Sequence, residues 1–169
     1  HQKNALKKNK PLKVSIFVGG PPAHSFSAVM PLPEKMSELN FAGILAGRRF
    51  RYSIKDDYVI SADADFVICG EMSCDLKPEG PFGDHLGYYS LKHEFPYLKI
   101  HKVYAKNNSI WPFTVVGRPP QEDSQFGKLI HMMTGNAVEN EIPGLKSVNA
   151  VDEAGVHPLL LQHLSQSRH

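Results

Sequence analysis

Short strand-like segments that end at turns are the feature that most limits what this chain can fold into. Residues 12–18 alternate and then run apolar into Gly19-Gly20-Pro21-Pro22, which predicts a strand followed by a sharp turn. Further strands are expected over residues 51–54, 58–61, 64–70, 97–104, 110–116 and 146–151. Asn107-Asn108 separates two of these strands, 97–104 and 110–116, and predicts that they form a hairpin.

Only two segments have the pattern of a helix. Residues 33–45 carry acids in the first turn and stop before Gly47. Residues 121–134 place apolar side chains at helical spacing and are followed by Gly135. Many strands with two helices predict a mixed β/α fold, mainly β, in the form of a small barrel or sandwich with flanking helices.

Composition excludes few classes of protein. The 169 residues suffice for one domain with a core, and 41% hydrophobic and 21% charged residues are ordinary for a soluble protein. The lysines before residue 14 lack interleaved aromatics, so a solvated face is expected and nucleic acid is not an expected partner. No apolar run approaches the ~20 residues of a membrane span. Cys69 and Cys74 predict thiols in a reducing cytosol, with a disulfide left open.

The run Pro78-Glu79-Gly80-Pro81-Phe82-Gly83-Asp84-His85 holds the densest candidate chemistry. Two prolines and two glycines restrict its backbone, so its side chains can be aimed rigidly. Two carboxylates, an aromatic ring and an imidazole form the inventory of a proton-transfer site. By composition alone the same run is a solvated acidic turn, because most acids in loops are surface charges.

Several motifs follow one another along the chain. They are Met30-Pro31-Leu32-Pro33-Glu34 with Ser37-Glu38 and Phe41-Ala42-Gly43; Ala64-Asp65-Phe66-Val67-Ile68 with Gly70-Glu71; Glu79 to His85 with Gly87-Tyr88-Tyr89; Val116-Gly117-Arg118-Pro119-Pro120 with Glu122-Asp123; and Ala154 to Leu160. In this order they resemble the UbiD family of reversible decarboxylases, from about Pro11 to Leu161. Cys69-Gly70 stands where that family usually has Glu-Gly.

This resemblance implies an FMN-binding split β-barrel with flanking helices. It implies a lyase that decarboxylates aromatic or α,β-unsaturated acids, with a 4-hydroxybenzoate-type substrate of quinone biosynthesis, through an adduct with prenylated FMN. The cofactors implied are prenylated FMN, Mn2+ (or Mg2+) and K+, and a flavin prenyltransferase is implied as the cofactor's supplier. A cytoplasmic homo-oligomer, possible at the membrane periphery, is implied for the parent enzyme.

The resemblance also assigns roles to residues. Asp84 is the proton donor and Glu79 its partner acid; Met30, Pro31 and Glu38 contact the cofactor; Glu38 binds the divalent metal; main-chain oxygens of Ser27, Ala28 and Met30 hold potassium; His85 and Phe126 line the substrate pocket. Without the resemblance, Glu38 is a helix-dipole acid, and Met30 and Phe126 are core residues. Arg118 is expected to form a local salt bridge with Glu122 or Asp123.

The resemblance covers only the central part of such an enzyme. It implies that residues 1–145 are the central domain and 146–169 the start of a C-terminal domain. The family's metal-binding Asn and His and its catalytic Arg then lie upstream of this chain, so little or no turnover is expected of the chain alone. The alternatives are a non-catalytic flavin-binding or oligomerisation module left by truncation, and an anion-binding protein that uses the basic N-terminal face.

Overall fold

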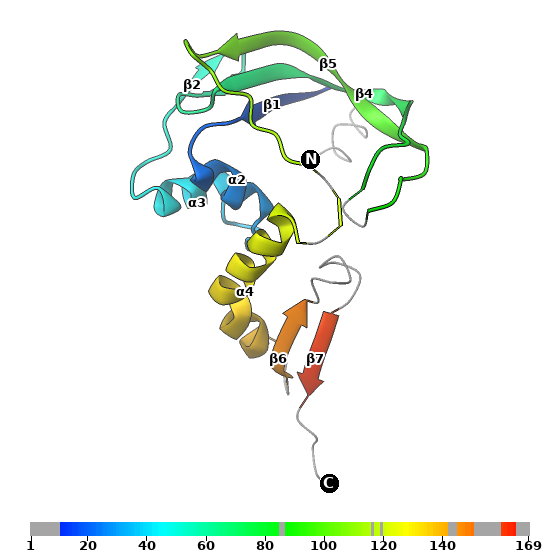
Figure 1. Cartoon of the computed structure of the whole chain (residues 1–169). Helices are drawn as coiled ribbons and strands as arrows, with labels where there is room; N and C mark the ends of the chain where they lie inside the picture. Colours follow the sequence, from blue (N-terminus) through cyan, green and yellow to red (C-terminus); the bar gives the residue numbers. More distant parts are fainter. Residues whose placement is uncertain are drawn as a thin grey trace. The chain divides into compact units, whose positions relative to one another are not determined.

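The computed structural model describes residues 11–84, 87–115, 117, 118, 120–141, 145–150 and 160–164, with side chains as far as residue 134. The chain divides into two compact units, which are described separately (Figure 1). The first comprises His1–Gly80 and Lys92–Phe113, and the second comprises Pro81–Leu91 and Thr114–His169. The domain division expected between residues 145 and 146 stays a prediction.

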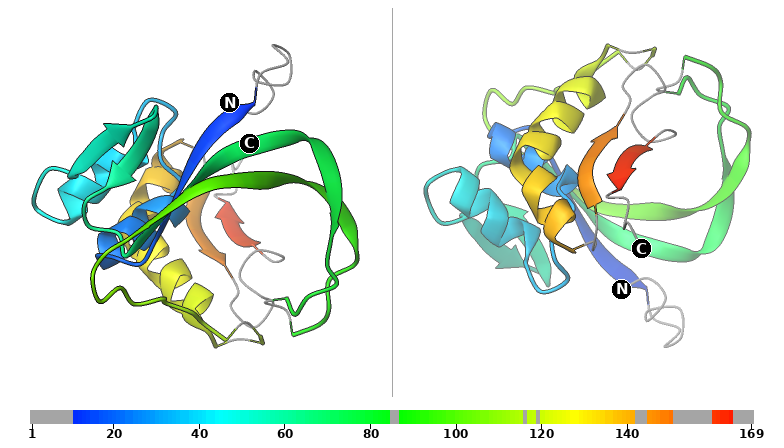
Figure 2. Two further views of the ribbon diagram at one scale, coloured as in Figure 1. Left: turned by 90° about the horizontal axis from the view of Figure 1, so that it is seen from above. Right: turned by 90° about the horizontal axis from the view of Figure 1, so that it is seen from below.

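An antiparallel sheet forms the centre of the first unit. Strands β1 (Leu12–Val18), β4 (Phe66–Glu79) and β5 (His93–Ala105) lie in the order β1-β4-β5, and β4 and β5 run side by side as a long ribbon (Figure 2). Strands β2 (Tyr52–Lys55) and β3 (Tyr58–Ser61) form a separate hairpin. Its turn residues Asp56 and Asp57 both have positive φ, as tight hairpin turns require.

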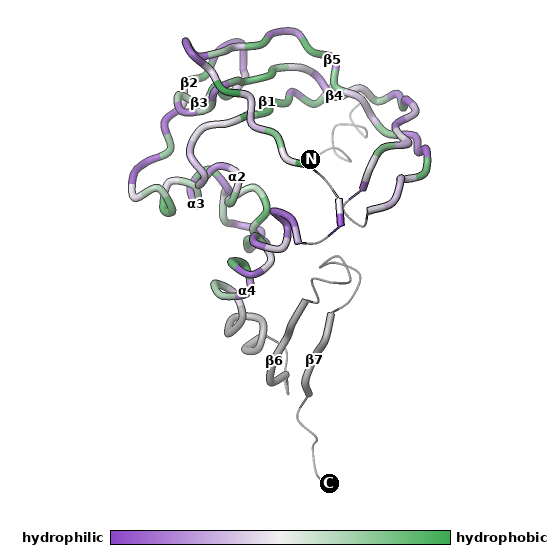
Figure 3. The backbone as a smooth tube through the Cα atoms, viewed as in Figure 1, coloured by the Kyte–Doolittle hydropathy of each residue, from purple (hydrophilic) through white to green (hydrophobic). Residues whose placement is uncertain are grey.

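The core of the first unit lies where β3 meets β1 and β4. Tyr58, Ile60, Ala64, Val67 and Cys69 are buried there. Hydrophobic and hydrophilic stretches alternate along the strands (Figure 3), as expected for a sheet with one buried face. The two thiols are free, with Cys69 buried and Cys74 exposed, so they form no disulfide.

Two short helices pack together in the first unit. Helix α2 (Pro22–Val29) was not predicted, although a proline in the first helical turn is a favourable start. Helix α3 (Glu38–Leu45) begins after Ser37, five residues later than predicted. Its end was predicted correctly: Gly47 has a φ of 63°, and Gly47 and Arg48 donate backbone hydrogen bonds to Ile44 and Gly43, which is the Schellman arrangement.

The second unit contains α4 (Glu122–Glu141), β6 (Leu145–Ala150) and β7 (Leu160–Leu164). Strands β6 and β7 pair antiparallel, and α4 contacts β6. Helix α4 continues past Gly135, so its predicted end is wrong. The strand expected at 146–151 is confirmed as β6, whereas β7 was not predicted.

The expectation of a mixed, mainly β fold is confirmed, and the closed barrel stays a prediction. The expected hairpin of residues 97–104 and 110–116 is wrong, because β5 pairs with β4 and residues 110–115 form no strand. Pro112 explains this, since proline removes a backbone donor from the ladder. None of the helices in the described residues is long and apolar enough to cross a membrane.

Candidate active site

The run with the two acids connects β4 to β5. Glu79 ends β4 and pairs with His93, the first residue of β5, so the connection comprises residues 80–92. Glu79 is exposed at the end of the ribbon, in the first unit, whereas Asp84 belongs to the second.

Residues 82–90 form a small hairpin of their own, called the acid hairpin below. The Ser90 N–H donates to the Phe82 carbonyl at 2.8 Å, and the Phe82 N–H donates to Ser90 Oγ at 3.2 Å. Gly83 and Tyr89 form the next bridge. These bonds fix both arms of the hairpin, so its tip is held by main-chain contacts.

Asp84 stands at this tip. Its N–H donates to the Tyr88 carbonyl at 2.9 Å, and its carbonyl accepts from the Gly87 N–H at 2.9 Å. Gly87 has a φ of 84°, which is typical of the residue that closes a short hairpin loop. Asp84 is half-buried, which suits a carboxyl that exchanges a proton with a bound molecule.

Arg118 lies against the acid hairpin. A Cβ added to Gly87 would be 2.0 Å from Arg118 Cγ, so only glycine leaves room for this side chain. The local salt bridge expected of Arg118 is not formed among the described residues. Glu122 instead accepts a hydrogen bond from Thr114 Oγ1 at 2.6 Å.

The end of α2 carries the residues predicted to bind potassium. Ser27 is buried and its Oγ donates to the His24 carbonyl at 2.9 Å, while Ala28 is exposed. Met30 and Pro31 follow the helix, and Met30 is half-buried. The last carbonyls of a helix lack intrahelical donors and carry partial negative charge, so this donor set suits a cation.

The Gly19-Gly20 turn positions α2 after β1. Asp65 Oδ2 accepts from the Gly20 N–H at 2.7 Å, and a Cβ on Gly19 would lie 2.3 Å from the same oxygen. Both glycines have positive φ. The turn therefore requires glycine for its backbone and for the close approach of Asp65.

Glu38 is the first residue of α3 and is exposed. Among the described residues no group of three or more His, Cys, Asp or Glu side chains could hold a metal ion. Glu38 therefore offers one hard oxygen ligand, and the described part of the chain does not complete a divalent site.

The other predicted residues fall in different places. His85 lies outside the described residues, and Phe126 is half-buried on α4. The first unit holds Ser27, Ala28, Met30, Pro31, Glu38 and Glu79, and the second holds Asp84 and Phe126.

A charged cluster around Asp63 was missed from the sequence. Arg48 Nη1 donates to Asp63 Oδ2 at 2.9 Å, and Arg51 Nη2 bonds Oδ1. These two bonds hold the pKa of Asp63 at about 2. His24 lies nearby, where burial lowers its pKa and its Nδ1 has no partner among the described atoms. Only the fold brings these residues together, so no local signal could have shown the cluster.

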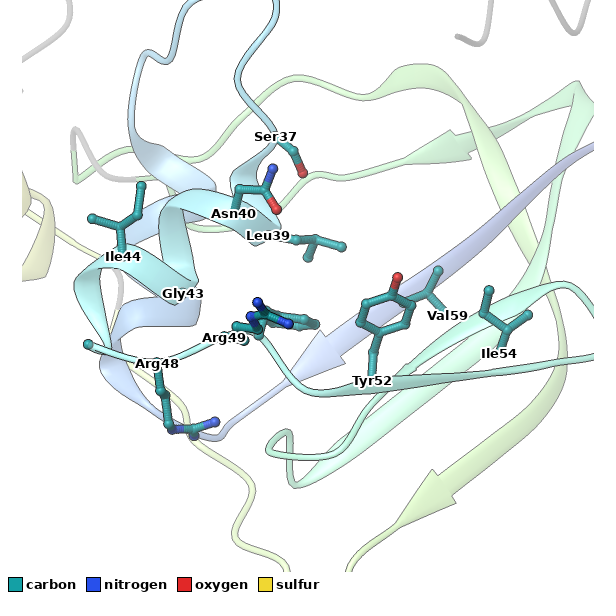
Figure 4. Close-up of a pocket in the computed structure, with 12 residues that line it drawn as sticks. Ser37, Leu39, Asn40, Gly43, Ile44, Arg48, Arg49, Tyr52, Ile54 and Val59 are labelled. Atoms are coloured by element: carbon teal, nitrogen blue, oxygen red, sulfur yellow. The ribbon is translucent and has the colours of Figure 1, made fainter.

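A pocket of about 790 Å³ lies between α3 and the β2–β3 hairpin (Figure 4). Leu39, Ile44, Ile54 and Val59 give it an apolar lining, and Arg49 lies between α3 and Tyr52. No residue predicted for the site lines this pocket.

Comparison with known proteins defines the class to which this fold and acid hairpin belong. Residues 1–119 match the family described as "UbiD: 3-octaprenyl-4-hydroxybenzoate carboxy-lyase Rift-related domain". The chain therefore belongs to the UbiD family.

Relatives and solved structures agree with this assignment. The chain is 40% identical over 162 residues to a 4-hydroxybenzoate decarboxylase component of Chlamydia pneumoniae, covering 94% of this chain and 28% of that protein. The vanillic acid decarboxylase of Sedimentibacter hydroxybenzoicus in closed form has a TM-score of 0.78 at 26% identity, covering 90% of this chain and 33% of that one. HmfF of Pelotomaculum thermopropionicum, in complex with FMN, has a TM-score of 0.77 at 19% identity, covering 98% and 38%. The chain thus spans between about a quarter and two fifths of the proteins it matches.

Proposed function

We propose that this chain is part of a lyase that reversibly decarboxylates aromatic carboxylic acids, with Asp84 as the proton donor. The names of the Chlamydia relative and of the vanillic acid decarboxylase support this reaction class. The observation that carries the proposal is the half-buried carboxyl of Asp84, held by main-chain bonds at the tip of the acid hairpin.

The proposed role of Asp84 is to protonate the ring carbon from which CO2 leaves. A fixed carboxyl within hydrogen-bond reach of that carbon can deliver the proton without reorganisation. Glu79 is proposed as the partner acid that returns the proton to Asp84. The substrate is proposed to be of the 4-hydroxybenzoate type, with other aromatic or α,β-unsaturated acids as the wider class.

The proposed cofactor is prenylated FMN, because UbiD-class neighbours are solved with FMN or prenylated FMN. Such a flavin, when bound, supplies the electron sink for decarboxylation. Met30 and Pro31 are proposed to contact it. The carbonyls of Ser27, Ala28 and Met30 would hold K+, and Glu38 would give one oxygen to Mn2+ or Mg2+, whose other ligands come from outside the described residues.

The test is Asp84→Asn in the longest polypeptide that carries this segment, supplied with prenylated FMN, Mn2+ and K+. CO2 release from 4-hydroxybenzoate should fall by about 100-fold or more, because general acid catalysis contributes roughly that much. Flavin absorbance of the purified variant should be unchanged. The control is Asp75→Asn, an exposed acid on β4, which should keep full activity. Normal turnover by the Asp84 variant would refute the assignment.

A second candidate function is a non-catalytic flavin-binding or oligomerisation module. The lack of a metal-ligand group among the described residues favours it. It predicts flavin binding without CO2 release in the same assay.

A further inference from the structure

We propose that Arg118, held in place by Gly87, binds the carboxylate of the aromatic acid beside Asp84. This inference rests on the proposed function for the identity of the acid. It supplies a substrate-binding cation from within this chain, on the same unit as the proton donor.

The first step is the position of Arg118. Asp84 and Gly87 are the ends of one turn, closed by the 2.9 Å bond from the Gly87 N–H to the Asp84 carbonyl. Such a bond keeps the two Cα atoms within about 7 Å. A Cβ on Gly87 would lie 2.0 Å from Cγ and 2.8 Å from Cδ of Arg118. The aliphatic stem of Arg118 therefore lies on the turn that carries Asp84.

The second step is charge. Arg118 is exposed, and in the described part of the chain its guanidinium makes no hydrogen bond or ion pair. The nearby acid Glu122 is engaged by Thr114. A guanidinium binds a carboxylate through two parallel hydrogen bonds, so Arg118 has both the charge and the free donors that an anionic substrate needs.

The third step is the surroundings. Phe82, Tyr88 and Tyr89 of the acid hairpin are 49%, 74% and 80% exposed. Aromatic rings this exposed are available to contact a flat ring. A cation for the carboxylate, rings for the aromatic body and a carboxyl for proton transfer thus occur together within residues 82–90 and 118.

The experiment titrates the purified chain with 4-hydroxybenzoate and follows backbone and Arg side-chain 15N shifts. Arg118→Gln should weaken binding about tenfold, because a charge-assisted pair is lost. The neutral analogue 4-hydroxybenzyl alcohol should bind wild type and variant equally. Arg49→Gln is the matched control, since Arg49 is the exposed cation of the pocket beside Tyr52 and should not affect binding.

A second variant tests the role of Gly87. Gly87→Ala should displace Arg118 and weaken 4-hydroxybenzoate binding as much as Arg118→Gln does. Adding Gly87→Ala to Arg118→Gln should then cause little further loss, because the cation is already gone. Independent, additive effects of the two substitutions would overturn the proposed coupling.

The outcomes separate this inference from the proposed function. Binding that is unaffected by Arg118→Gln, binding that is lost in Arg49→Gln, or no binding at all would overturn the inference, whatever the Asp84 assay shows. Binding through Arg118 together with normal turnover by the Asp84→Asn variant would refute the proton donor and leave the carboxylate site standing.

Discussion

Asp63 is the side chain on which the charges of the first unit converge. Its two carboxylate oxygens accept from Arg48 and Arg51, and its carbonyl accepts from Lys106 Nζ at 2.6 Å. Asp63 is buried while both arginines are substantially exposed. This contrast limits the energy of the pairs, because solvent screens the arginines.

Replacing Asp63 by Asn should therefore destabilise the first unit by about 1 kcal/mol. Urea unfolding followed by the fluorescence of Trp111, the chain's single tryptophan, measures this. Trp111 is a suitable probe because its ring packs against Phe66 of β4 at 5.2 Å. The matched control is Asp57→Asn, which breaks the exposed pair with Lys13 and should change little. Equal losses in both variants would contradict the account.

The same carboxylate predicts a pH dependence. The folded pKa of Asp63 is about 2, below its ordinary value of 3.8, so the unfolded chain binds more protons between these values. The contribution of Asp63 to stability is present above pH 3.8 and is lost as the pH falls toward 2. Asp63→Asn should remove this part of the acid destabilisation, which urea unfolding at a series of pH values measures.

At the residue scale, the sequence indicated what is contiguous and missed what is not. Asp84 and Glu79 were found because a short run of Gly, Pro and acids surrounds them. The contact of Arg118 with Gly87 joins residues 31 positions apart, so local reasoning assigned Arg118 to a neighbouring acid instead.

At the element scale, α2 shows why helices after prolines are easily missed. Gly19-Gly20-Pro21-Pro22 predicts a turn, which is correct, but Pro22 also begins a helix of eight residues. A segment this short presents too few turns for a periodic pattern. The β4–β5 ribbon was missed for another reason: Pro78 and Pro96 interrupt the apparent strands, although both belong to them.

The Gly19-Gly20 turn offers a test of how α2 is positioned. Gly19→Ala should lower the free energy of unfolding by about 3 kcal/mol, because it adds a positive-φ penalty and a clash with Asp65. Gly47→Ala is the matched control, since Gly47 also has positive φ but no atom within 4 Å of its added Cβ. It should cost only about 1 kcal/mol. Trp111 fluorescence in urea reports both variants, and equal losses would argue against the Asp65 contact.

At the scale of the whole molecule, the chain spans 28% of the length of the Chlamydia relative. Its described residues contain no complete metal-ligand group. The family and the mainly β fold could be predicted from the order of the motifs. Closure of a barrel, and the partners of Glu38, depend on contacts that no local pattern encodes.

The chain alone should therefore show little or no turnover. The measurement is CO2 release from 4-hydroxybenzoate after reconstitution with prenylated FMN, Mn2+ and K+, compared with a longer polypeptide that carries the same segment. Comparable rates for the two would show that this chain already holds a complete site.

The central claim is that Asp84 delivers the proton to the carbon that loses CO2. The most direct measurement is solvent deuterium exchange at that carbon of the product phenol, followed by NMR in D2O with the cofactor-loaded longer polypeptide. The account predicts exchange with the native protein and none above background with Asp84→Asn, while flavin absorbance stays equal. Exchange at the native rate in the Asp84→Asn variant would contradict it.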